Sequence, residues 1–200
     1  MTTLMTTLTA NPLASPAVHA SKRALRALLL AQRFSLGRGH TQRTMQRWLE
    51  SAARQLNTQH AGATVALYAP HKGEVDVRRL AALIHHPLCL PVVQDAANSP
   101  HQALQFARWQ AGDALAADRY GIATPVKRDW IVPSVLLVPC VGFTANGLRL
   151  GYGGGYYDRT LAALHAQNTN TCAIGVAWQS ARCVFDADEH DVVMDGVWAL

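Results

Sequence analysis

The chain has 200 residues, half of them hydrophobic, which is enough apolar material for one compact core, so a single domain is expected. No apolar run reaches the roughly 20 residues of a membrane-spanning helix, since even the stretch 135–143 is broken by Pro139, and a membrane protein is excluded. The net charge is +5, and the basic excess is local, because residues 1–54 hold eight Lys and Arg against the single acid Glu50.

The first 20 residues are rich in Thr, Ala and Pro and lack both the basic start and the apolar centre of a secretory signal. They are predicted to be a disordered extension ahead of one domain over residues 21–200. The four cysteines, Cys89, Cys140, Cys172 and Cys183, form no C-x-x-C pair and have mainly apolar neighbours. Buried free thiols are therefore predicted, rather than a zinc site or disulfides, and a cytoplasmic location is expected.

Two helices are predicted near the start of the chain. Ser21 is a suitable N-cap, and leucines at helical spacing follow it, which predicts a helix over about 22–33. A second helix is predicted over about 41–57, where an apolar stripe consists of Met45, Trp48, Leu49, Ala52 and Leu56. The arginines outside this stripe are expected to be solvated.

Further along the chain, short apolar runs alternate with helical intervals. The runs cover 64–68, 88–93, 135–138 and 172–178, and the helical intervals cover 75–84 and 156–166. Crossovers of this length favour parallel strands, so the predicted fold is α/β, with a mainly parallel central sheet flanked by helices on both faces. In such sheets ligands bind at the carboxyl ends of the strands.

A glycine-rich segment is the main chemical signal in the sequence. Four of the five residues from Gly151 to Gly155 are glycine, and they precede a helix predicted to begin near Tyr156. Glycine lets backbone N–H groups approach an anion, and a helix N-terminus adds partial positive charge, which is typical of a phosphate-binding loop. A flexible turn could have the same composition, but the flanking Arg149, tyrosines and Asp158 favour a functional site.

The segment matches neither common nucleotide-binding pattern. Tyr156 stands where G-x-G-x-x-G requires its last glycine, and no Gly-Lys-Ser/Thr follows, which excludes the Rossmann and Walker A motifs. Asp158 would be repelled by phosphate oxygens unless a divalent cation lay between them, so it is a candidate Mg²⁺ ligand. An acid in the first helical turn also complements the helix dipole, and position alone leaves both interpretations open.

Four ordered segments produce a family resemblance. They are Lys-Arg-Ala-Leu-Arg at 22–26, Gly-Glu-Val-Asp at 73–76, Leu-Leu-Val-Pro at 136–139 running into Gly-Leu-Arg-Leu-Gly-Tyr-Gly-Gly-Gly-Tyr-Tyr-Asp-Arg at 147–159, and Glu-His-Asp at 189–191. Through them the chain resembles the 5-formyltetrahydrofolate cyclo-ligase family, also called 5,10-methenyltetrahydrofolate synthetases. The resemblance implies an enzyme in which ATP, with Mg²⁺, activates the formyl oxygen of 5-formyltetrahydrofolate. N10 then closes the ring, and ADP and phosphate leave.

The resemblance also implies a role for each matching residue. Those that would bind ATP are Lys22, Arg23, Arg26, Arg149, Leu150, Gly151, Tyr152, Gly153, Gly154, Gly155, Tyr156 and Tyr157. Arg149 would also be the catalytic residue that stabilises transition-state charge. Asp158 and Asp191 would share Mg²⁺, and Glu74, Trp109 and Tyr156 would bind the folate. Read without the family, Glu74 is a helix-start acid, Trp109 a core residue and Asp191 part of a solvated turn.

Some positions depart from the family pattern, and they keep other functions open. Thr124-Pro125 replaces the Pro-Glu of the family pattern, and Thr144 replaces an Asp. The chain ends in Trp198-Ala-Leu200 where the family has Thr-Glu. A related protein acting on a phosphosugar or on another substrate of ATP is one alternative.

A basic nucleic-acid-binding protein is an alternative of a different class. Its footprint would consist of Arg23, Arg33, Arg38, Arg43 and Arg47. That reading explains the charge but leaves the glycine-rich segment without a role. Small-molecule partners are therefore expected, with no nucleic acid and no membrane, and the protein is expected to be a monomer.

Overall fold

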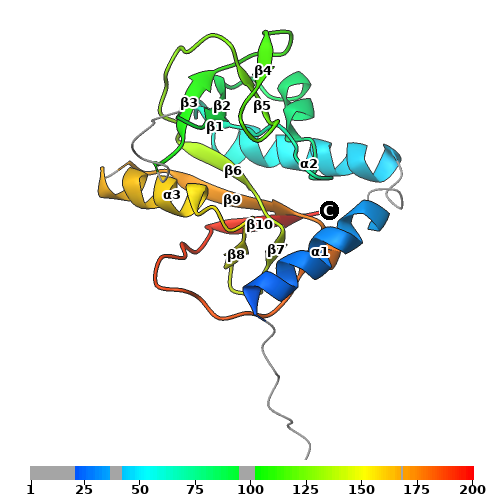
Figure 1. Ribbon diagram of the computed structural model, residues 1–200. Helices are drawn as coiled ribbons and strands as arrows, with labels where there is room; N and C mark the ends of the chain where they lie inside the picture. The colour runs from blue at the N-terminus through cyan, green and yellow to red at the C-terminus, as the bar shows by residue number, and fades with distance from the viewer. Residues whose placement is uncertain (1–20, 37–41, 95–101, 168) are drawn as a thin grey trace, which may run out of the picture.

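The computed structural model describes residues 21–36, 42–94, 102–167 and 169–200. Figure 1 shows a central sheet with helices on either side of it. Its strands lie in the order β10 (Gly196–Ala199), β9 (Cys172–Ala177), β6 (Val135–Pro139), β1 (Val65–Ala66), β2 (Leu88–Val92) and β3 (Gln105–Arg108). All neighbouring pairs are parallel except β2 and β3. The extension predicted for residues 1–20 lies outside the described residues.

Successive strand residues face opposite sides of the sheet, and each side has its own apolar cluster. Val65 and Leu137 pack on the side covered by α1 (Lys22–Leu36), α2 (Gln42–Gln59) and the 3₁₀ helix η1 (Val77–Ala82). Ala66 and Leu136 pack on the opposite side, against α3 (Tyr156–Ala166). The prediction of an α/β domain with a mainly parallel sheet and helices on both faces is thus confirmed. Within the described residues, no helix is long and apolar enough to span a membrane.

The predicted helices are found, with one exception. The N–H of Ala24 donates to Ser21 Oγ at 3.3 Å, which confirms the cap of α1, and α2 buries the predicted stripe through Leu49 and Leu56. The start at Thr41 lies outside the described residues. The interval 75–84 is wrong as a regular α-helix, because only the six residues of η1 form a 3₁₀ helix. The Asp76 carboxylate caps it by accepting from the N–H of Arg78.

The sequence did not predict several of the short strands, although the two-residue β1 lies within the predicted run 64–68. The strands not predicted are β3, β10 and the hairpins β4 (Leu115–Ala117) with β5 (Ala123–Pro125) and β7 (Gly142–Phe143) with β8 (Arg149–Leu150). Two to four residues are too few to show an alternating pattern, so the hydrogen bonds to partner strands define these elements. The cysteines are free as predicted, with Cys89 and Cys140 buried and Cys172 and Cys183 half-buried.

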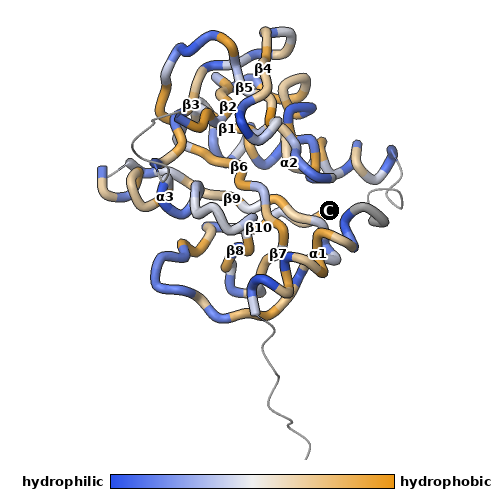
Figure 2. The backbone as a smooth tube through the Cα atoms, viewed as in Figure 1, coloured by the Kyte–Doolittle hydropathy of each residue, from blue (hydrophilic) through white to orange (hydrophobic). Residues whose placement is uncertain are grey.

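The strand order reverses direction at the centre of the sheet. β1 pairs with β2 on one side and with β6 on the other. From β2 the chain continues toward one edge of the sheet, and from β6 it continues toward the other edge. A crevice forms at such a point, beyond the carboxyl ends of the strands. Figure 2 shows hydrophobic residues along β6 and hydrophilic residues in the segment between β9 and β10. The sheet therefore supplies an apolar floor, and the connecting segments supply the polar groups above it.

Candidate active site

The large cavity of the protein opens at the carboxyl edge of the sheet and has a volume of about 1030 Å³. Its walls come from the start of α1, the ends of β1, β2 and β6, the glycine-rich loop 151–155, the turn of the β4–β5 hairpin and the acidic segment 188–192. Single-ligand cavities are typically about 300–1,000 Å³. The space is therefore sufficient for a large substrate or for two substrates side by side.

Three arginines hold the glycine-rich loop from different elements. Arg26 Nε on α1 donates to the carbonyl of Gly151 at 2.8 Å, and Arg159 Nη2 on α3 donates to the carbonyl of Gly154 at 2.8 Å. The Arg149 guanidinium lies so close to Gly151 that a Cβ there would stand 2.3 Å from Nη1. The loop carbonyls thus face arginines on the protein side.

Two of the loop glycines adopt left-handed backbone conformations. Gly153 has a φ of +94°, and Gly155, the N-cap of α3, has a φ of +64°. Side-chain-bearing residues are disfavoured at such angles. These glycines turn the chain sharply into α3, whose N-terminus consequently points at the cavity. The sequence prediction of an anion-binding geometry agrees with this arrangement.

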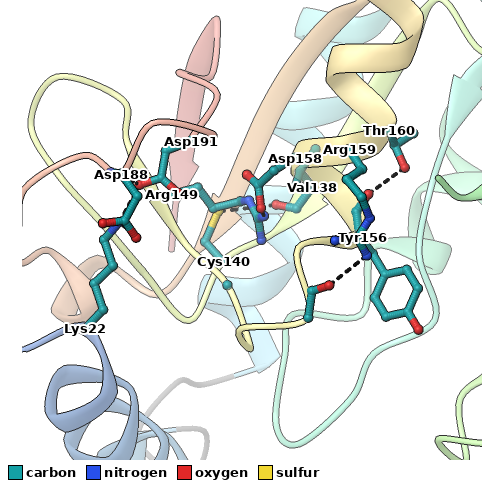
Figure 3. Close-up of polar contacts among 12 residues, drawn as sticks. Lys22, Val138, Cys140, Arg149, Tyr156, Asp158, Arg159, Thr160, Asp188 and Asp191 are labelled. Carbon is teal, nitrogen blue, oxygen red and sulfur yellow. Dashed lines mark hydrogen bonds and ion pairs between the residues drawn. The ribbon is translucent and has the colours of Figure 1, made fainter. Parts of the chain in front are cut away.

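Arg149 and Asp158 form a largely buried ion pair at the base of the loop (Figure 3). Arg149 Nη2 lies 2.8 Å from Asp158 Oδ2, with the two side chains 6% and 19% exposed. The guanidinium also lies over the Tyr157 ring at 5.5 Å, while its Nε has no hydrogen-bond partner. Arg149 also lines the large cavity, so a buried positive charge lies beside the space that a ligand would occupy.

Lys22 and the acidic segment form a second charged cluster (Figure 3). The Lys22 ammonium donates to Asp191 and lies 2.7 Å from Asp188 Oδ2. Burial lowers the pKa of Lys22, but the hydrogen bonds to Asp188 and Asp191 raise it overall. Burial likewise raises the pKa of Asp191, but the hydrogen bonds from Lys22 and the Asp188 N–H, together with the charges of Lys22 and Arg149, lower it overall. Both groups are therefore held in their charged forms.

Asp158 and Asp191 line the same cavity but do not make a closed metal site. Among the described residues, no group of three or more His, Cys, Asp or Glu side chains could hold a metal ion. Mg²⁺ in nucleotide sites is commonly bound by one or two carboxylates together with phosphate oxygens and water. Two carboxylates beside a phosphate-type loop fit Mg²⁺ with a nucleotide, and they do not fit a structural metal bound by protein alone.

Glu74 is a buried carboxylate at the opposite wall, just after β1. Its side chain is 4% exposed, Oε2 accepts the N–H of His71 at 2.8 Å, and Oε1 has no hydrogen-bond partner. Burial raises its pKa from 4.5 to about 7, against the opposing effects of the His71 N–H, the Tyr152 hydroxyl and the guanidinium groups of Arg33 and Arg149. An unpaired buried acceptor lining a cavity is expected to receive a donor from a ligand.

Tyr156 connects α3 to the turn of the β4–β5 hairpin. Its hydroxyl lies 2.6 Å from that of Tyr120 and accepts from Arg119 Nη2 at 2.9 Å, while the Arg159 guanidinium lies 5.2 Å from the centre of its ring. Tyr156 and Tyr120 both line the cavity. The hairpin turn is thereby fixed to the same helix that follows the glycine-rich loop.

Two predicted site residues do not reach the cavity. Trp109 is buried in the apolar cluster of the α2 side and borders a smaller cavity of about 470 Å³ elsewhere, so the structure does not bring it to the large cavity. Arg23 is exposed on α1 and does not line the large cavity, whereas its neighbours in the motif, Lys22 and Arg26, do. Helical rotation places residue 23 on a different face.

The sequence also missed residues that the fold brings to the cavity. They are mainly His71, Lys72, Asp118, Tyr120, Arg159 and Asp188. Arg159 had a signal, because it directly follows Asp158 in the matched segment. Asp188 had a similar signal, because it directly precedes the matched Glu-His-Asp at 189–191, whereas the hairpin residues Asp118 and Tyr120 had none.

The departures from the family pattern fall away from the cavity. Thr124 Oγ1 donates to the carbonyl of Ala116 within the β4–β5 hairpin, and Thr144 Oγ1 accepts the N–H of Leu148 in the β7–β8 turn. Neither side chain lines the large cavity. Residues 198–200 continue the sheet edge through β10. These substitutions consequently change local turns and an edge, and they leave the cavity wall as it is.

A parallel sheet with clustered cations and carboxylates at its carboxyl edge defines an α/β enzyme that binds anionic small molecules. The chain belongs to the 5-formyltetrahydrofolate cyclo-ligase family, whose sequence profile matches residues 18–199. The 5-formyltetrahydrofolate cyclo-ligase of Haemophilus influenzae is 30% identical over 154 residues, which cover 69% of this chain and 80% of that protein.

Solved structures of similar proteins agree with the fold. The 5,10-methenyltetrahydrofolate synthetase of Aquifex aeolicus matches with a TM-score of 0.66 and 26% identity, covering 90% of this chain and 90% of that one. The synthetase of Mycoplasma pneumoniae matches with a TM-score of 0.67 and 24% identity, covering 90% of this chain and 98% of that one. The predicted family membership is thus confirmed, and the chain is an enzyme of this family.

Proposed function

We propose that the protein converts 5-formyltetrahydrofolate to 5,10-methenyltetrahydrofolate, using Mg-ATP and releasing ADP and phosphate. One observation supports this more than any other: the buried Arg149 guanidinium lies against a glycine-rich loop and is paired with Asp158 at 2.8 Å. A fixed cation beside backbone N–H groups and a helix N-terminus suits the transferring phosphoryl group.

The nucleotide would occupy the half of the cavity next to α1 and α3. Lys22 and Arg26 reach it from α1, Arg149 from β8, and the N–H groups of 153–157 from the loop and the first turn of α3. The loop carbonyls of Gly151 and Gly154 are already occupied by arginines, so the N–H groups are the loop atoms left for phosphate oxygens. Phosphoryl transfer requires this kind of charge stabilisation and positioning rather than a protein nucleophile.

The folate would occupy the half of the cavity next to β1. Glu74 Oε1 has an ion-pair contact with Arg33 at 3.9 Å but no hydrogen-bond donor in the protein, so it is suited to accept a pterin N–H. Tyr156 and Tyr120 offer aromatic surface near the loop. The formyl oxygen then attacks the γ-phosphorus of ATP, and the bond to the bridging oxygen breaks as ADP leaves. N10 adds to the activated formyl carbon and loses its proton, and the former formyl oxygen departs with phosphate. Arg149 would stabilise the charge that develops on the phosphoryl oxygens.

Asp158 and Asp191 would hold Mg²⁺ together with the nucleotide. Bound there, the ion would neutralise charge on the phosphate oxygens. Each carboxylate is held by a cation of the same site, Asp158 by Arg149 and Asp191 by Lys22. The carboxylates are thereby oriented before any ligand enters. The cytoplasmic location and the monomeric state stay predictions from the sequence.

The test is to incubate the purified protein with Mg²⁺, ATP and 5-formyltetrahydrofolate while measuring the methenyl product by absorbance and ADP by a coupled assay. Both products should appear in equal amounts, and neither without ATP. Absence of both products would reject the proposal. ADP release with no methenyl product would point to a different acceptor, such as the phosphosugar considered from the sequence.

A further inference from the structure

Arg33 is a buried arginine of α1 that lies behind the cavity wall. Its side chain is 2% exposed, and it does not line the cavity. Burying a guanidinium is costly unless its donors are paired, so its partners indicate what it does. Those partners come from three segments that are distant in sequence.

The first partner is the carbonyl of Cys140, which follows β6 and accepts from Arg33 Nη2. The second is the hydroxyl of Tyr152 in the glycine-rich loop, which accepts from Arg33 Nη1 at 3.0 Å. The third is Glu74, whose Oε1 lies 3.9 Å from the same Nη1. The aliphatic stem of Arg33 passes Gly73, where a Cβ would stand 3.4 Å from its Cγ.

These contacts form a closed series of interactions that connects the two halves of the cavity. Tyr152 Oη accepts from Arg33 and donates to the carbonyl of His71 at 3.2 Å. The N–H of His71 donates to Glu74 Oε2 at 2.8 Å, and Glu74 Oε1 returns to Arg33. The His71 ring also packs edge-on against Tyr152, with ring centres 5.6 Å apart. One side chain thus connects the loop with the carboxylate of the opposite wall.

We propose that Arg33 is a positioning residue that sets Tyr152 and Glu74 in a fixed mutual arrangement, and so couples nucleotide binding at the loop to folate binding at Glu74. The inference rests on the proposed function for the identity of the two ligands. Loop movement on nucleotide binding changes the Tyr152 contact, and Arg33 transmits that change to Glu74. Arg33 itself touches neither ligand.

The test compares Arg33→Lys, Arg33→Met and Tyr152→Phe with the wild type and with Arg54→Met, which removes an exposed arginine from α2. Lysine keeps the charge but cannot span Tyr152 and the Cys140 carbonyl at once. The dissociation constant of 5-formyltetrahydrofolate is measured with and without a non-hydrolysable ATP analogue. In the wild type and Arg54→Met, the analogue should tighten folate binding by about fivefold or more, as is usual for coupled sites. In Arg33→Lys and Tyr152→Phe, this factor should fall to near one.

A measurement without ligands keeps the inference testable where the folate assignment fails, and the coupling measurements on Arg33→Lys and Tyr152→Phe keep it testable where Arg33→Met folds poorly. The charged and titratable groups near Glu74 are Arg33, Arg149, Tyr68, Tyr152, Tyr157, Cys140 and His71. Loss of the Arg33 charge raises the pKa of Glu74 further. The melting temperature of Arg33→Met should then fall more steeply than that of the wild type between pH 6 and 8, while Arg33→Lys stays close to the wild type.

An equal coupling factor in Arg33→Lys and Arg54→Met, including a factor of one in the wild type, would overturn the inference. Failure of the wild type to bind 5-formyltetrahydrofolate would instead reject the proposed function. In that case Arg33→Met should still weaken binding of the ATP analogue and alter the pH dependence of melting, and Arg33→Lys should weaken binding of the analogue alone, whereas Arg54→Met should do neither. Unchanged nucleotide affinity and unchanged pH dependence would then overturn it.

Discussion

Arg149 and Asp158 lie nine residues apart, one on β8 and one in the first turn of α3, and their side chains meet at 2.8 Å across the glycine-rich loop. The pair joins the predicted catalytic cation to a predicted metal ligand. Deleting either partner would leave the other charge half-buried and unpaired, which destabilises proteins. Experiments on this pair should therefore use substitutions that keep hydrogen bonding or charge.

Arg149→Lys keeps the positive charge but loses the planar fork that pairs with Asp158. We expect kcat to fall by about 10²–10³-fold, as for the loss of a preorganised donor to the transition state, with a smaller change in the KM for ATP. Steady-state kinetics with both substrates checks this. Arg54→Lys on the exposed side of α2 is the control and should retain full turnover. A normal kcat in Arg149→Lys would show that Arg149 does not have the proposed catalytic role.

Asp158→Asn and Asp191→Asn test the proposed Mg²⁺ ligands. Each keeps a hydrogen-bond acceptor for its partner, Arg149 or Lys22, but removes a negative charge from the metal. We expect the Mg²⁺ concentration for half-maximal activity to rise at least about tenfold in each. Direct titration of the protein–ATP complex with Mn²⁺, followed by electron paramagnetic resonance, gives a readout separate from turnover. If Mn²⁺ affinity is unchanged, that carboxylate is not a ligand.

Glu74→Gln should weaken folate binding and stabilise the protein at alkaline pH. The folded-state pKa of Glu74 is raised from 4.5 to about 7, so the folded protein binds this proton more tightly than the unfolded chain does. Stability is consequently lost as the pH rises between these values, by of the order of 3 kcal/mol in full. Glutamine removes that loss, so the variant should melt higher than the wild type at pH 8, with little difference at pH 4.5.

Thermal melts across this pH range check the stability effect, and binding assays check the ligands. In Glu74→Gln, the KM for 5-formyltetrahydrofolate should rise by a much larger factor than the KM for ATP does. Identical pH dependence of melting in Glu74→Gln and the wild type would show that the pKa of Glu74 is the same in the folded and unfolded states.

Gly153→Ala should impair the glycine-rich loop. Its φ of +94° is unfavourable for a residue with a Cβ, and such strain costs about 1–2 kcal/mol. We expect a higher KM for ATP and a lower melting temperature. Gly196→Ala is the matched control, because a Cβ there meets no atom within 4 Å and its φ is not positive. Equal kinetics in the two variants would mean that the loop conformation does not matter for ATP.

Trp109→Phe should affect stability and leave the active site intact. Trp109 is 8% exposed within the α2-side cluster and does not line the large cavity. We expect a loss of about 1–3 kcal/mol in unfolding free energy, as for other core substitutions, and an unchanged KM for 5-formyltetrahydrofolate. Denaturant unfolding and kinetics measure the two quantities separately. A raised KM at unchanged stability would return Trp109 to the folate site.

The sequence by itself determined the α/β class, the long helices and the position of the glycine-rich loop. These features depend on local patterns: leucines at helical spacing after Ser21, apolar runs of strand length, and glycines between Arg149 and a helix start. Such patterns act over a few residues, so they can be read without knowing the partners. The matched segments added the family, which the comparisons confirm.

Only the tertiary structure decided which side chains share the cavity. The short strands and hairpins exist through hydrogen bonds to distant partners, so Tyr120 had no local signal. Lys22 and Arg23 are adjacent in sequence, yet the rotation of α1 brings only Lys22 to the acidic segment. From the sequence, Arg33 belonged only to the alternative nucleic-acid footprint, but the packing of α1 against β6 places its guanidinium between Tyr152 and Glu74. Burial and partner choice depend here on contacts more than 40 residues away along the chain.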